Sequence, residues 1–144
     1  MTVAVTMTFA VAVVSVANRR EHWAVRARRV KREREAVALA WRAVGRPRFS
    51  LPVVVTLTRL GRGTLDEDNL AGAFKAMRDE VAHCLLDRGT CRRNGPPMRR
   101  NGRHGWQIAP CSCNDADPRI EWRLAQQRGT PGVEIEITAM EDPA

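Results

Sequence analysis

The sequence has few aromatic residues: three Phe, four Trp and no Tyr among 144 residues. Proteins that bind single-stranded nucleic acid without sequence preference stack the bases on rows of aromatic side chains. The composition therefore excludes a binding surface of that type. Trp23 and Trp41 fall in a basic segment with helical character, where tryptophan more often belongs to the hydrophobic core than to a base-stacking surface.

The sequence also lacks an apolar run that fits a membrane helix or a signal peptide. Its most apolar stretch, residues 3–16, has no basic segment before it and is interrupted by Thr6 and Thr8. The bulky residues of this stretch occupy odd positions, and a period of two is typical of a strand. We therefore expect a cytoplasmic protein that has no membrane partner.

The four cysteines show no regular disulfide framework of the kind found in small secreted proteins. Cys84, Cys91, Cys111 and Cys113 could instead bind zinc, with help from His83 or His104, and so stabilise a long loop. However, the spacing C-x6-C-x19-C-x-C matches no common zinc module. Ordinary thiols are the favoured interpretation, and a structural zinc protein is the minor alternative.

Positive charge is abundant and unevenly distributed. The chain has 24 Lys and Arg against 16 Asp and Glu, a net charge of +8, and eleven of these cations lie between Arg19 and Arg48. Six more Arg and no acid lie between Arg88 and Arg103. Basic segments on either side of acidic motifs are expected of an enzyme that grips phosphates and cuts one of them. A solvated basic helix and loop is the alternative. The predicted DNA-binding residues are Arg19, Arg26, Arg28, Arg29, Lys31, Arg32, Arg92, Arg93, Arg99 and Arg100.

The length and the hydrophobic pattern predict one domain, residues 1–144, without repeats or linkers. The order β-α-β-α-β-β predicts an α/β (α+β) fold in which helices pack on one mixed sheet. Residues 88–113 are rich in Gly, Pro and Arg, lack periodicity and are predicted to form a long loop. Strands are predicted at 2–14, 51–60, 119–126 and 133–139, and helices at 19–44, ended by Gly45, and at 68–86.

The two predicted helices each have an apolar stripe at helical spacing, and this stripe should face the sheet. In the first helix the stripe consists of Val30, Val37, Leu39, Trp41 and Val44, and in the second of Leu70, Phe74, Met77, Val81 and Leu85.

The strongest chemical motif is Asp66-Glu67-Asp68-Asn69, which lies between the end of a predicted strand and the start of a predicted helix. Carboxylates two residues apart at such a point can share a hard cation, and a sparse acidic site suits Mg²⁺ better than Ca²⁺. A third acid should come from elsewhere in the fold, and Asp115 lies just before the third long strand. The alternative is that Asp66 and Asp68 only cap the helix.

These residues resemble the RusA-type Holliday junction resolvases. In that family Asp-x-Asp-Asn-Leu opens a helix and an Asp-Asp-Ala-like element leads into a strand. The corresponding segments here are residues 66–70 and Asn114-Asp115-Ala116, and the turn at Ser15–Arg19 is similar to a Ser/Asn-rich turn of the family. The element order agrees along most of the chain, apart from the long loop.

The resemblance implies a homodimer that binds four-way DNA junctions and cuts two strands symmetrically with Mg²⁺, or with Mn²⁺. It makes Asp66, Asp68 and Asp115 the metal ligands. The family's catalytic Lys would fall at position 72, which is Gly72 here. Lys75, seven residues after Asp68 and hence on the same face of one continuous helix, is predicted to contact the scissile phosphate instead.

Other acids near the motifs are expected to have lesser roles. Asp117 is a rival third ligand, but the proline after it indicates a turn. Glu67 should point away from the two aspartates, and Asp79 and Glu80 are expected to be solvated. If the departure at Gly72 has removed activity, the chain is a DNA-binding module of the same fold that does not cleave.

Overall fold

The sheet is built around β2, which has a neighbouring strand on each side. The computed structural model describes residues 4–15, 20–87, 98–99, 106–107 and 113–140. The long strands are β1 (Ala4–Phe9), β2 (Val53–Gly61), β5 (Ile120–Arg128) and β6 (Gly132–Ala139), in the order β1-β6-β2-β5. β2 is parallel to β5 and antiparallel to β6, and β1 is antiparallel to β6.

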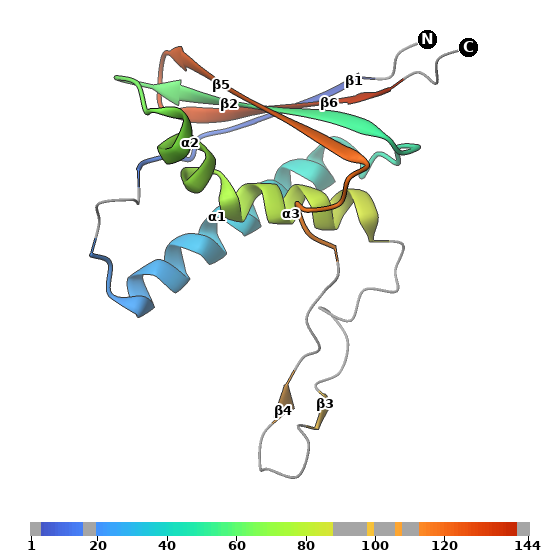
Figure 1. The fold of residues 1–144 in the computed structure, drawn as a ribbon, viewed down its shortest axis with the longest axis horizontal. Helices are drawn as coiled ribbons and strands as arrows, with labels where there is room; N and C mark the ends of the chain where they lie inside the picture. Colours follow the sequence, from blue (N-terminus) through green and yellow to red (C-terminus); the bar gives the residue numbers. More distant parts are fainter. Residues whose placement is uncertain (1–3, 16–19, 88–97, 100–105, 108–112, 141–144) are drawn as a thin grey trace.

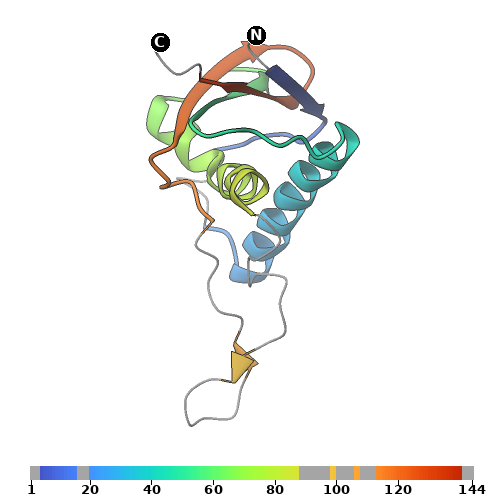
Figure 2. The same cartoon turned by 90° about the vertical axis from the view of Figure 1, so that its right-hand side faces the viewer.

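Among the described residues, three helices cover one face of this sheet and leave the other face open (Figures 1 and 2). They are α1 (Trp23–Ala43), α2 (Glu67–Ala73) and α3 (Lys75–Leu86). Within the described residues the fold is the predicted mixed sheet with helices packed on it. No helix of this part of the chain is long and apolar enough to cross a membrane.

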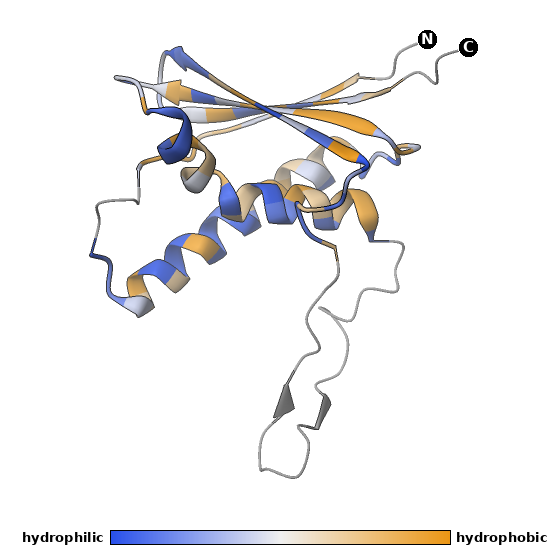
Figure 3. Cartoon of the chain, viewed as in Figure 1, coloured by the Kyte–Doolittle hydropathy of each residue, from blue (hydrophilic) through white to orange (hydrophobic). Residues whose placement is uncertain are grey.

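The core lies between the sheet and α1 and α3. The β-branched run of β2 turns Val53, Val55 and Leu57 toward the helices, and all three are fully buried. Every residue of the stripe predicted for the second helix is buried. The first stripe is only partly correct, because Val37 and Trp41 are buried whereas Leu39 is 61% exposed and Val44 is 38% exposed. Leu39 lies two residues from both Val37 and Trp41 and therefore points to the opposite side of α1, and Val44 is the C-cap of the helix. The first half of α1 is mostly hydrophilic and extends away from the sheet (Figure 3).

The end of α1 follows from a glycine. Gly45 has φ +90°, a conformation that glycine adopts without steric cost. Its N–H donates to the carbonyl of Arg42 at 3.0 Å, and the N–H of Arg46 donates to the carbonyl of Trp41 at 3.0 Å. This pair of hydrogen bonds is a Schellman motif, which satisfies the last carbonyls of a helix. The predicted stop at Gly45 is confirmed.

The single helix predicted over 68–86 is wrong, because the chain forms two helices that meet at Phe74 (φ −90°, ψ 0°). The axis changes direction there (Figure 1). The Phe74 side chain is fully buried in the core, so packing fixes the point at which α2 turns into α3. Asp68 and Lys75 therefore belong to different helices, and the prediction that they share a face of one continuous helix is wrong.

The connection between β5 and β6 crosses the end of β2. The last residues of β2 pair with Arg128 of β5 on one side and with Gly132 of β6 on the other. Gly132 allows a close approach there, because a Cβ would lie 3.0 Å from the carbonyl oxygen of Phe9, which is a tight contact. Within the predicted long loop, β3 (Met98–Arg99) pairs with β4 (Trp106–Gln107) as a separate two-stranded ribbon.

Candidate active site at the α2–α3 junction

Asp66 is the N-cap of α2. Its Oδ1 accepts a hydrogen bond from the Asn69 backbone N–H at 2.8 Å, and its Oδ2 accepts one from the Asn69 side chain at 2.9 Å. Asp68 lies in the first turn of the same helix and is exposed. Both carboxylates therefore sit at the positive end of the helix, where negative charge is favoured. The capping interpretation is confirmed for Asp66, and it leaves Asp68 without a structural role of this kind.

Two side chains from the sheet fix the loop that leads into Asp66. Arg59, 9% exposed, donates to the carbonyls of Val13 at 2.9 Å, Arg62 at 3.3 Å and Gly63 at 3.2 Å. Gln126 of β5 pairs with the backbone of Leu65 through both ends of its amide, at 2.8 Å and 2.7 Å. These hydrogen bonds attach the loop between β2 and α2 to the sheet, so the sheet sets the position of Asp66.

A tight turn before β5 presents Asp115 to α3. Asn114 accepts from the N–H of Ala116 at 2.9 Å, which closes the turn, and Trp122 of β5 donates from its indole N–H to the Asp115 carbonyl at 3.0 Å. Asp117 accepts three hydrogen bonds from Arg119. The prediction that Asp117 has a turn role is confirmed.

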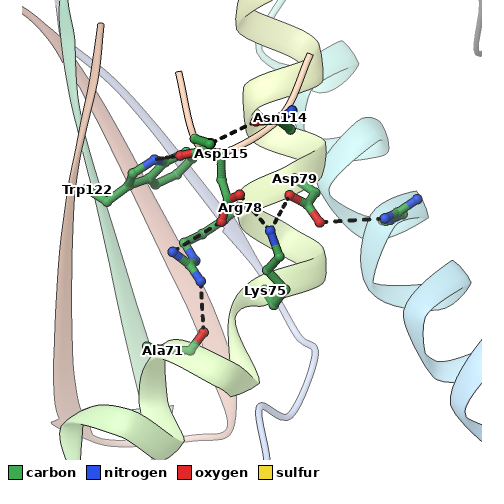
Figure 4. A network of polar contacts seen from close by, with 9 residues as sticks. Ala71, Lys75, Arg78, Asp79, Asn114, Asp115 and Trp122 are labelled. Carbon is green, nitrogen blue, oxygen red and sulfur yellow. Dashed lines mark hydrogen bonds and ion pairs between the residues drawn. The ribbon is translucent and has the colours of Figure 1, made fainter. Parts of the chain in front are cut away.

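Asp115 is the centre of a network of charges that joins this turn to α3 (Figure 4). The Lys75 ammonium donates to Asp115 at 2.6 Å and to Asp79 at 2.9 Å. Arg78 lies 3.2 Å from the other Asp115 oxygen and donates to the Ala71 carbonyl of α2 at 3.3 Å. Because Ala71 is one turn after Asp68, Arg78 links Asp115 to the helix that carries the aspartate motif.

The protonation states in this network follow from the ion pairs. Burial alone would raise the pKa of Asp115, but the Lys75 hydrogen bond and the Arg78 charge outweigh it and lower this pKa. Burial likewise opposes the charge of Lys75, but the hydrogen bonds to Asp115 and Asp79 outweigh it and raise the Lys75 pKa. Both groups are therefore charged at neutral pH.

The structure brings together Lys75 and Asp115, which are 40 residues apart, but it does not gather the three predicted ligands around one point. Among the described residues, no group of three or more His, Cys, Asp or Glu is arranged to hold a metal ion. Asp66 and Asp68 lie at the start of α2, and both oxygens of Asp115 face cations.

No family model matches the sequence, and a search of curated proteins finds no significant match. The resemblance to the junction resolvases therefore depends on the motif residues themselves.

The predicted DNA-binding residues of α1 divide into two groups. Arg26, Arg28, Lys31 and Arg32 are exposed, whereas the Arg29 guanidinium is 12% exposed and held by Glu21 and Glu33. Trp23, predicted for the core, is 76% exposed, and this prediction is wrong because the start of α1 lies beyond the sheet. Arg19, Arg92, Arg93, Arg100, Cys91 and Cys111 lie outside the described residues, and Arg99 is described only as part of β3.

The sequence did not predict the burial and the contacts of the acidic residues of α3. Asp79 and Glu80 were expected to be solvated, but the Asp79 side chain is only 21% exposed and Glu80 is 3% exposed. Asp79 contacts Lys75 on its own helix and Arg34 of α1, the latter at 3.7 Å. The four-residue spacing of Lys75 and Asp79 was the available signal for this pair.

Proposed function

We propose that this protein is a Mg²⁺-dependent endonuclease that acts as a homodimer and cleaves branched DNA, such as four-way junctions, at symmetric positions. The observation that carries the proposal is the Asp115–Lys75–Asp79 network, which lies beside the helix opened by Asp66 and Asp68. Carboxylates next to fixed cations, with an exposed basic helix nearby, are the groups needed to bind a phosphodiester and to promote its hydrolysis.

The donor chemistry of the three aspartates fits Mg²⁺, which prefers carboxylate oxygens. Asp68 is exposed and Asp115 is 12% exposed at its side chain, so the two carboxylates are accessible to different degrees. When bound, the metal would supply a water of lowered pKa and neutralise charge on the phosphate. Asp66, Asp68 and Asp115 would hold it, which requires that the metal draws together carboxylates that the described residues do not gather around one point, and that Asp115 gives up contacts with Lys75 or Arg78.

Lys75 serves the proposed reaction as a cation rather than as a base. Its raised pKa keeps the ammonium protonated at neutral pH. Its side chain is 54% exposed, so it can donate a hydrogen bond to a phosphate oxygen when Asp115 turns away. Arg78 is less exposed, at 20%, and its contacts with Ala71 and Asp115 give it a positioning role.

A second candidate function is a DNA-binding module that does not cleave. It is favoured by the commitment of both Asp115 oxygens to cations, and by the glycine at the position where the resolvases have a lysine. This candidate needs the basic helix α1 but no metal.

A cleavage assay distinguishes the two functions. A labelled four-way junction and a linear duplex of the same sequence are incubated with the purified protein in Mg²⁺ or in EDTA. The nuclease cuts the junction only in Mg²⁺. Asp68→Asn should reduce the rate by at least about 100-fold while junction binding remains, because loss of a direct ligand costs more than loss of a supporting residue.

Glu67→Gln is the matched control, since it neutralises an exposed acid one residue away, and it should cut at nearly the normal rate. A wild-type protein that binds the junction without cutting it would instead support the binding module. If Asp68→Asn cuts normally, the aspartate motif is not the metal site.

A further inference from the structure

A groove between α1 and the α2–α3 junction has a lining that suits an anion. It encloses about 460 Å³ and is lined by ten residues, among them four basic side chains and two acidic ones. A volume of this size lies within the range of ligand pockets in proteins, roughly 300–1,000 Å³. The basic residues are Arg26, Arg29, Arg34 and Lys75, and the acidic ones are Glu21 and Asp79.

The cations of this groove differ in how much of their hydrogen-bonding capacity is already used. The Arg29 guanidinium forms ion pairs with Glu21 and Glu33, which use its hydrogen-bond donors and hold it in place. The Arg34 side chain is 40% exposed, and its guanidinium lies 3.7 Å from Asp79, which is longer than a hydrogen bond. Arg26 is exposed and forms no ion pair with another described residue. The guanidinium groups of Arg26 and Arg34 therefore keep N–H donors that the acids of the groove do not satisfy, and these donors can bind an anion.

Gly72 lines the same groove and has no internal reason to be glycine. It lies inside α2, where glycine is among the poorest helix formers. Its backbone is not in the left-handed region, and a Cβ built on it would meet nothing within 4 Å. A glycine that no neighbour requires leaves open space, and here that space belongs to the groove.

We propose that this groove binds a phosphate group of the DNA backbone, with Gly72 leaving room for it and Arg26, Arg34 and Lys75 supplying hydrogen-bond donors. Lys75 contacts both the groove and Asp115, so the bound phosphate lies next to the aspartate network. The inference rests on the proposed function and adds to it a defined phosphate subsite. It also gives a reason why a lysine at position 72 is absent: its side chain would occupy the subsite.

The test measures junction binding in EDTA, where cleavage does not interfere, together with the midpoint of urea unfolding. Gly72→Ala and Gly72→Leu replace the glycine with better helix formers, so their unfolding midpoints should be unchanged or higher. Their dissociation constants for the junction should nevertheless rise, by about 3-fold for Ala and at least about 10-fold for Leu, because a larger side chain fills more of the subsite. Arg26→Ala should also weaken binding, by about 3-fold or more, because it removes one of the donors to the phosphate.

Two variants control for general effects of these substitutions. Gly129→Ala adds the same methyl group at another glycine with open space around it, in the turn after β5. Arg123→Ala removes the same charge as Arg26→Ala, but from an exposed position of β5. Both should bind the junction like the wild type.

The outcomes separate this inference from the proposed function. If the wild type cuts the junction in Mg²⁺ while Gly72→Leu and Arg26→Ala bind it normally, the groove is not a phosphate subsite and the nuclease proposal stands. If these variants bind DNA normally but lose the thermal stabilisation that inorganic phosphate gives the wild type, the groove takes free phosphate, and its assignment to DNA is wrong. A wild type that does not bind the junction removes both proposals.

Discussion

At the scale of single residues, Asp115 is the most informative position, because its ion pairs stabilise the fold and also occupy a proposed metal ligand. Its folded-state pKa is lowered, so its contribution to stability is present above the unfolded pKa, about 3.9, and is lost as the pH falls through the folded value. Asp115→Asn should therefore lower the free energy of unfolding by about 1–3 kcal/mol at pH 7. Urea unfolding should show this difference shrinking toward zero near the folded pKa.

Glu121→Gln is the control for this prediction, since the Glu121 side chain is 46% exposed and its partner Arg123 is 62% exposed. Exposed pairs of this kind contribute little, about 0–1 kcal/mol. An Asp115→Asn difference that is the same at pH 7 and pH 3 would mean that the ion pairs with Lys75 and Arg78 do not cause it.

The candidate site could be predicted from the sequence only where local patterns carry the information. The aspartates of residues 66–68 stand out because a strand ends and a helix begins there. Arg78 and Trp122 could not be found in this way, because their contacts with Asp115 join parts of the chain that no spacing rule relates. Lys75 contacts Asp115, but it was selected by its spacing from Asp68 along one continuous helix, and the chain forms two helices instead.

At the scale of elements, the Gln126–Leu65 pair shows how the sheet positions the aspartate motif. Gln126→Ala removes both hydrogen bonds to the Leu65 backbone and should reduce stability by about 1–2 kcal/mol. Hydrogen exchange of the Leu65 amide should become faster. The proposed cleavage should slow while junction binding remains, because the loop before Asp66 loses its anchor.

Gln127→Ala is the matched control, because Gln127 is the neighbouring residue of β5 and is exposed. It should leave exchange, stability and cleavage close to the wild-type values. Equal effects of the two substitutions would show that β5 as a whole, rather than the amide pair, holds the loop.

The elements themselves were largely predictable, whereas their arrangement was not. Apolar stripes at helical spacing indicated α1 and the region of α2 and α3, a period of two indicated β1, a β-branched run indicated β2, and Gly45 marked the end of α1. Nothing in the sequence indicates that β5 and β6, separated by a short turn, lie on opposite sides of β2. That order depends on which strands bury their apolar faces together, and this is a property of the whole fold.

At the scale of the whole molecule, charge differs between the helical side and the open face of the sheet. Arg28 and Arg32 are one turn apart on α1 and exposed. On the sheet, β6 carries Glu134 and Glu136, which pair in register with threonines of β1 and β2. DNA should therefore approach the helical side, and a basic residue there should contribute to counterion release.

The salt dependence of junction binding tests this orientation. Arg28→Ala and Arg32→Ala should each reduce the slope of log K against log[salt] by about 0.9 if each cation contacts one phosphate of the duplex. Arg123→Ala, on the sheet, should leave the slope unchanged. A larger change for Arg123 than for the α1 residues would place the DNA on the open face.

The oligomeric state is the last property of the whole molecule that the proposed function requires. A symmetric pair of cuts needs two equivalent sites, and a closed dimer with two-fold symmetry supplies them. β6 lies between β1 and β2 and has no unpaired edge, so its backbone cannot pair with a second copy. β1 and β5 are the edge strands, so β1 is a place where two copies can pair their backbones.

Light scattering at micromolar concentration should give twice the chain mass of 16.1 kDa. Thr6→Lys should shift the protein toward the monomer, because lysine on an edge strand opposes pairing, while Gln127→Lys on the β5 edge should remain dimeric. The reverse result would move the seam to β5, and a wild type that stays monomeric on junction DNA would contradict symmetric cleavage.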